Sequence, residues 1–115
     1  MSKADTPNDG RLPPAEPVRL AELLDYVSAA VVSRTLSQGK SGTITLFAFD
    51  AGQGLSEHTA PFDALVQVLD GEVELTIAGN KIPVRSGQSV LMPANVPHAL
   101  HSDKRFKMLL TMIRG

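Results

Sequence analysis

The stretch DGEVELTIAGN, residues 70–80, decides the fold class, because apolar and polar side chains alternate along it. Val73, Leu75 and Ile77 fall on one face of an extended chain, and the residues between them are polar. Asp-Gly precedes this run and Gly-Asn follows it, and both dipeptides tolerate the positive φ angles of tight turns. The stretch is therefore predicted to form a hairpin strand with one buried face.

Short β-rich runs with turn residues between them extend from this strand in both directions along the chain. They predict further strands at residues 31–36, 43–49, 64–69, 81–84, 89–92 and 105–113. Short antiparallel strands of this number form a barrel or sandwich that closes on itself and leaves few exposed edges. We expect one all-β domain over residues 18–115.

The N-terminal region differs from the rest of the chain in composition. Four of the eight prolines fall within residues 1–17, which are otherwise mostly small or polar. This composition predicts a flexible, disordered tail, part of which would dock against the domain through Leu12 or Val18. Apolar residues then recur at helical spacing over residues 18–27, which predicts one short helix before the barrel.

Composition also limits the chemistry and the partners of the protein. The 115 residues have a net charge of −1 and no cysteine. The absence of thiols excludes disulfides, thiolate zinc sites and iron–sulfur clusters, so any metal must have nitrogen or oxygen ligands. No basic cluster favours nucleic acid or an anionic membrane surface, and no apolar segment is long enough to span a bilayer. We expect a cytoplasmic protein with neither type of partner.

Two segments carry a family resemblance. The first begins with Gly52, continues to His58 after five residues, and has a glycine thirteen residues beyond the histidine. The second is GQSVLMPANVPH, residues 87–98. Together they resemble the two motifs of small single-domain cupins over about residues 40–113. The positions in register with that pattern are Gly52, His58, Gly71, Gly87, Pro93 and His98.

The resemblance implies a double-stranded β-helix, which is a small jelly-roll barrel, and a metal site of three histidines and one carboxylate. Two of those ligand positions hold Ala60 and Ala64, so only His58 and His98 transfer as ligands. The second motif has Asn95 where the family has glycine, and asparagine tolerates the left-handed conformation that such a glycine supplies. The implied cofactor is a divalent ion such as Zn, Ni, Fe or Mn, held by an incomplete ligand set.

Three nearby polar residues are candidates to complete this set: Asp63, Gln67 and His101. Gln67 is the only polar residue of the run 64–69, so its amide needs either a hydrogen-bond partner or a ligand role. Strand alternation counted from His58 places Gln67 on the opposite face, unless a bulge near Pro61 resets the count. The predicted metal set is His58, His98 and Gln67. His101 is predicted to lie on the surface, and Asp63 to end a turn.

These observations predict a metal-associated site for a small-molecule ligand at one mouth of the barrel, with the reaction undetermined. The alternative is a ligand-binding or sensing cupin that uses neither metal nor catalysis, and the two alanines favour it. A third possibility is a structural dimer with a vestigial pocket. A homodimer is expected in each case, because a small barrel leaves strand edges and apolar outer positions that benefit from cover.

Overall fold

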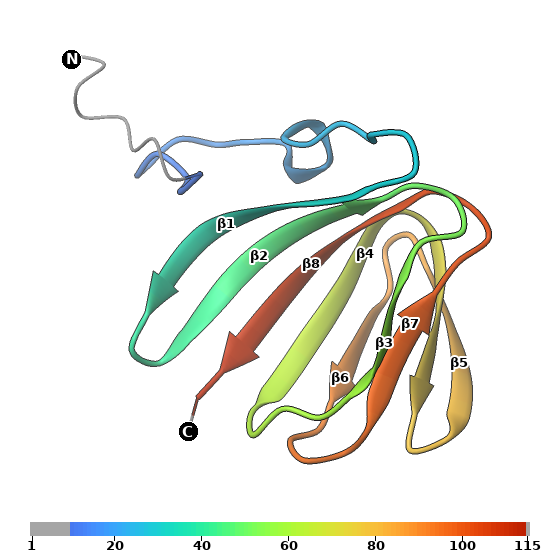
Figure 1. Ribbon diagram of the computed structural model, residues 1–115. Helices are drawn as coiled ribbons and strands as arrows, with labels where there is room; N and C mark the ends of the chain where they lie inside the picture. Colours follow the sequence, from blue (N-terminus) through green and yellow to red (C-terminus); the bar gives the residue numbers. More distant parts are fainter. Residues whose placement is uncertain (1–9, 115) are drawn as a thin grey trace.

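Strand β4 (Asp63–Ile77) organises the molecule, because it pairs with four other strands. The computed structural model describes residues 10–114. The remaining strands are β1 (Val31–Gly39), β2 (Gly42–Phe49), β3 (Gly54–His58), β5 (Asn80–Arg85), β6 (Ser89–Met92), β7 (His98–His101) and β8 (Phe106–Ile113). The predicted all-β fold is confirmed, and Figure 1 shows the strands curling into a barrel of the jelly-roll type.

All strand pairs are antiparallel, and β4 belongs to two groups of them. Its first half lies between β8 and β6, and β8 continues the sheet to β2 and β1. Its second half lies between β5 and β7, and β7 continues to β3. The two halves of one strand therefore hold the two sides of the barrel together.

The change of partners occurs at Gly71. The sequence predicts a turn here between two strands, whereas the structure has one continuous strand whose register shifts between Val68 and Asp70. Gly71 has φ +75°, and a Cβ atom at this position would lie 2.2 Å from the carbonyl oxygen of Arg105. Only glycine fits both the backbone conformation and the close approach of the neighbouring chain.

The barrel interior is filled by the inward faces of both sheets. Val66 and Val68 from the first half of β4 and Leu75 from the second half are each at most 2% exposed. Phe49 and Phe106 stack with their ring centroids 4.3 Å apart and are fully buried. Each such side chain contributes roughly 1.5–3 kcal/mol of apolar burial, so this core is the main source of stability.

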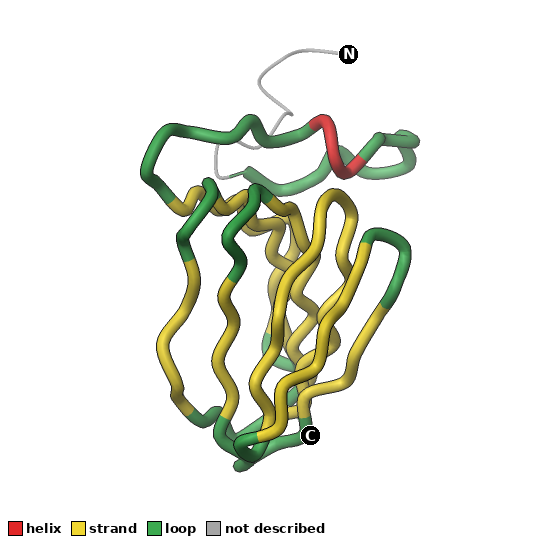
Figure 2. The backbone as a smooth tube through the Cα atoms, turned by 90° about the vertical axis from the view of Figure 1, so that its right-hand side faces the viewer, coloured by secondary structure: helices red, strands yellow, loops and turns green. Residues whose placement is uncertain are grey.

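A second apolar cluster lies on the outer face of the β1–β2–β8 side. Residues 10–30, which we call the strap, cross this face, and Figure 2 shows them running over one end of the strands. Leu20, Leu23 and Leu24 of the strap pack with Leu12 against a buried group formed by Leu36, Leu46 and Leu109. The backbone N–H of Leu12 also donates to the carbonyl oxygen of Leu36 (2.9 Å). The sequence predicted docking through Leu12 or Val18, and the structure shows these contacts for Leu12.

The predicted helix over residues 18–27 is wrong. The segment contains one 3₁₀ turn, η2 (Leu20–Glu22), and no α-helix. The leucines at helical spacing instead anchor an irregular strap to the sheet, and so short a helix is marginal without favourable packing. Lys107 Nζ donates to the carbonyl oxygen of Ala21 (2.6 Å), which removes an acceptor that a continuing helix would use. Residues 1–9 of the predicted tail lie outside the described residues.

The end of the strap is fixed by Tyr26. Its hydroxyl donates to Asp70 Oδ2 (2.5 Å), and its ring lies under the cationic groups of Arg105 and Lys107. Burial, together with the hydrogen bond to Asp70, raises the pKa of Tyr26 above its ordinary range. The strap therefore joins the barrel through polar as well as apolar contacts.

Within residues 10–114, no helix is long and apolar enough to cross a membrane.

We predict that Gly71→Ala destabilises the protein by about 1–3 kcal/mol, because alanine would adopt a left-handed backbone and meet the Arg105 carbonyl. Gly39→Ala is the matched control, since nothing lies within 4 Å of a Cβ atom there. Urea unfolding of both variants measures the difference. Equal stability of the two variants would contradict the role given to Gly71.

Candidate functional site

The two histidines of the sequence motifs meet at one end of the barrel, which we call the mouth. His58 is the last residue of β3, and His98 is the first residue of β7. An irregularity between Leu55 and His58 shifts the register so that the two histidines become cross-strand partners. Neither β3 nor β7 was among the predicted strands. Only the family resemblance therefore predicted that these two histidines belong to one site.

The two imidazole rings face each other through their Nε2 atoms, which are 3.1 Å apart. The ring centroids are 4.3 Å apart, and the ring planes are inclined by 70°. Each Nδ1 lies against a backbone carbonyl oxygen: Ser56 for His58 (2.7 Å) and Val96 for His98 (3.1 Å). Because a carbonyl oxygen only accepts, each Nδ1 donates, and the lone pair of the neutral ring is on Nε2.

This arrangement fits a metal ion. Backbone acceptors at Nδ1 fix the tautomer and leave Nε2 free to coordinate, which is the usual outer support of a histidine ligand. Imidazole nitrogens bind first-row ions at about 2.0–2.1 Å, so adjacent ligands of one ion lie roughly 3 Å from each other. The observed 3.1 Å between the Nε2 atoms matches that spacing. A shared proton also fits the space between two such lone pairs.

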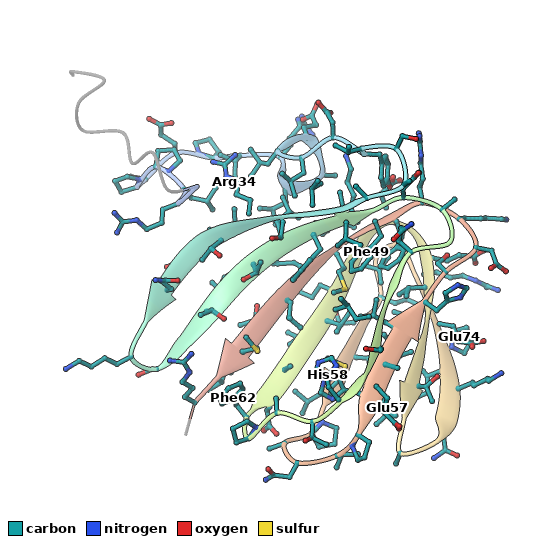
Figure 3. All side chains as sticks on the ribbon, in the orientation of Figure 1. Arg34, Phe49, Glu57, His58, Phe62 and Glu74 are labelled. Carbon is teal, nitrogen blue, oxygen red and sulfur yellow. The ribbon has the colours of Figure 1, made fainter. Side chains whose placement is uncertain are left out.

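The two histidines differ in exposure. His98 is 6% exposed, whereas His58 is exposed. Figure 3 shows the His58 ring within the curl of the strands, and the neighbouring Glu57 directed away from it. The pair therefore has one buried member and one member that is exposed to solvent.

Backbone hydrogen bonds tie the two sequence motifs together beside the pair. The N–H of Asn95 donates to the carbonyl oxygen of Ala60 (2.8 Å), and the N–H of Ala94 donates to Asp63 Oδ1 (2.9 Å). Asn95 has φ +63°, the left-handed conformation that the sequence predicted for this position. Asp63 is thus a loop anchor for residues 93–97, and this loop places His98 at the mouth.

The structure does not bring the other candidates to the histidine pair. Gln67 shares a face of β4 with Leu65 and Leu69, whereas Ala64 and Val66 are buried on the inward face. His101 is exposed at the other end of β7, with Nε2 3.9 Å from Asp103 Oδ1. Among residues 10–114, no three histidine, cysteine or acidic residues form a metal-binding group. Of the three histidines, only His58 and His98 meet in the described structure.

The inner wall of the mouth is formed by a row of residues in register across four strands. Thr43 pairs with Met112, Met112 with Ala64, and Ala64 with Met92. We call these four residues the mouth row. Thr43 Oγ1 is buried and has no hydrogen-bond partner within the described chain. Nothing in the sequence indicated this row or the unpaired hydroxyl.

Comparisons with known proteins agree with this fold. The family described as "Cupin domain" matches residues 45–113. A conserved protein of unknown function from Streptococcus pyogenes is 35% identical, with a TM-score of 0.86 over 91% of this chain and 92% of its own. A cupin superfamily protein from Desulfitobacterium hafniense is 32% identical, with a TM-score of 0.85 over 91% of this chain and 96% of its own.

A further likeness covers only part of a longer protein. A Cupin 2 conserved barrel domain protein from Leptotrichia buccalis is 39% identical, with a TM-score of 0.79 over 82% of this chain and 46% of its own. Curated proteins give no significant match. The comparisons therefore bear on the family and the fold, and they assign no reaction.

We predict that Asn95→Gly leaves stability nearly unchanged, whereas Asn95→Val costs about 1–2 kcal/mol, because a branched residue is strained in the left-handed conformation. Thermal unfolding of the two variants measures this. A Val variant as stable as the Gly variant would show that the loop before His98 does not depend on the conformation of Asn95.

Proposed function

The chain belongs to the cupin family, and on this premise we propose that it binds a first-row metal ion through His58 and His98 and presents that ion to a small molecule at the mouth. The observation that carries the proposal is the 3.1 Å approach of two Nε2 atoms whose rings are both anchored through Nδ1. Anchored rings lose little freedom when an ion binds, so the pair is prepared for coordination.

A metal ion held by two imidazoles keeps other coordination positions open, where it would polarise a bound oxygen or lower the pKa of a bound water. The protein's own contribution is to position groups around that ion. His58 is exposed, which leaves a route from solvent to the ion. The mouth row closes the site on the side of the barrel interior. The unpaired Thr43 hydroxyl supplies one hydrogen bond to a polar group of the bound molecule.

The second candidate function is a binding or sensing module without metal. Alanines at positions 60 and 64 favour it, because the family pattern has a histidine and a carboxylate there. In this function the facing histidines hydrogen-bond an organic ligand directly, and the pocket performs no reaction. Metal uptake by the purified protein separates the two candidates.

We predict that the untagged protein binds Zn²⁺ or Ni²⁺ weakly, and that His58→Ala and His98→Ala each lower the affinity by at least about tenfold. His101→Ala is the matched control and should bind like the wild type, since this exposed ring is outside the pair. Gln67→Ala should also leave the affinity unchanged, because Gln67 lies on the other face of β4. Isothermal titration calorimetry measures all four variants.

Protons compete with metal ions for imidazole nitrogens, so the affinity should fall as the solution is made more acidic. Wild-type protein that takes up no ion even at millimolar concentration would contradict the metal proposal and leave the metal-free module. A loss of binding in His101→Ala equal to that in His58→Ala would place the ion elsewhere.

We also propose that the protein forms a homodimer through the outer face of the sheet beside the strap. Leu91 and Ile113 are 56% and 58% exposed, and Leu91 is in register with Leu65 of the neighbouring strand. Exposed apolar residues grouped on a sheet face benefit from cover by a second copy.

Light scattering at tens of micromolar should therefore give twice the monomer mass, and Leu91→Asp should shift the protein towards the monomer. Asn80→Asp, on strand β5 of the other side of the barrel, is the control for added charge. A monomeric wild type would contradict this proposal.

A further inference from the structure

Two methionines of the mouth row border the same inward-facing alanine. Met92 ends β6 and is 3% exposed, and Met112 lies near the end of β8 and is partly buried. Both are cross-strand partners of Ala64, one on each side of β4. Cross-strand partners point to the same face of a sheet, with Cβ atoms about 4.5–5.5 Å apart. The two methionines therefore border Ala64 from both sides on the inward face of the sheet.

This wall and the histidine pair lie at the same end of the barrel. Figure 1 shows β6 and β8 ending, and β4 and β7 beginning, at one end. Met92 and His98 are separated only by the loop of residues 93–97, which is hydrogen-bonded to Ala60 and Asp63. His98 and Leu100 are both buried on one face of β7, and Leu100 packs in the same core cluster as Met92. The histidines and the methionines thus share the barrel interior at the mouth.

The chemistry of these groups selects among metal ions. Divalent ions such as Mn²⁺ and Fe²⁺ are usually held with carboxylate oxygens, and no acidic residue within residues 10–114 completes a three-residue group with the pair. Thioethers are soft, uncharged ligands that favour Cu(I), and imidazole suits copper as well. A monovalent ion also brings less charge than a divalent ion into a wall that holds no carboxylate.

We propose that Met92 and Met112 provide thioether coordination beside His58 and His98, so that this site selects Cu(I) over Zn²⁺. The inference rests on the proposed function, because the histidine pair supplies the nitrogen ligands. It extends that function by naming the ion and by giving the methionines a role beyond core packing.

The test uses the full chain and two metal probes. The double variant Met92→Leu/Met112→Leu removes both sulfur atoms with little change in side-chain volume, so the fold should be retained. Met108→Leu is the matched control, because Met108 is fully buried and pairs with Val68 and Phe47, farther from the mouth. Cu(I) affinity is measured anaerobically by competition with a chromogenic chelator, and Zn²⁺ affinity is measured by competition with a fluorescent chelator.

We expect the double variant to lose at least about tenfold in Cu(I) affinity and to keep its Zn²⁺ affinity, and Met108→Leu to keep both. Unchanged Cu(I) affinity in the double variant would overturn the methionine inference, even if both ions still bind through the histidines. Failure of the wild type to bind either ion would instead overturn the proposed function. X-ray absorption of the Cu(I)-loaded wild type should show sulfur scattering, and a spectrum with nitrogen neighbours alone would contradict the inference.

Discussion

The continuity of β4 through its bend at Gly71 is the constraint on which the rest of the structure depends. Val66 and Leu75 lie on this one strand, yet they pack into the same core from two different groups of strands. The bend needs a left-handed backbone where the Arg105 carbonyl approaches closely, and glycine alone meets both demands. The positions of all other strands follow from the partners that each half of β4 accepts.

The site is a direct consequence of that arrangement. The first half of β4 carries Ala64 and its methionine neighbours, and the second half pairs through Ile77 with His98. His98 in turn pairs with His58 on β3. One end of the barrel therefore combines two anchored imidazoles with a soft, largely apolar wall. This combination is the basis of the proposed ion site, and His58 is its solvent-exposed member.

The sequence predicted the parts of the fold that depend on local pattern and on turn chemistry. Alternation at Val73, Leu75 and Ile77 and the turn residues after them correctly indicated a hairpin strand. The leucines of the strap have helical spacing but pack on the outer face of the sheet, so tertiary contacts override the local preference. The register of Gln67 was also open, since the effect of Pro61 on strand parity is set by the β3–β4 connection rather than by the residues themselves.

The candidate site was predictable only in part, because motif spacing identifies the two histidines but not their surroundings. His58 and His98 are recognisable by their distances from glycines and Pro93. The backbone acceptors at Ser56 and Val96 depend on loop geometry, and the mouth row depends on pairing between four strands. These features arise from contacts distant in sequence, for which a single chain offers no periodic signal.

The most direct test of the account is the position of a bound ion, measured by anomalous diffraction from crystals of the untagged protein loaded with Zn²⁺. We predict one ion at the mouth, bonded to Nε2 of both His58 and His98, with each Nδ1 still donating to its backbone carbonyl. An ion bound instead near His101 and Asp103, or anomalous signal absent from the histidine pair, would contradict the account.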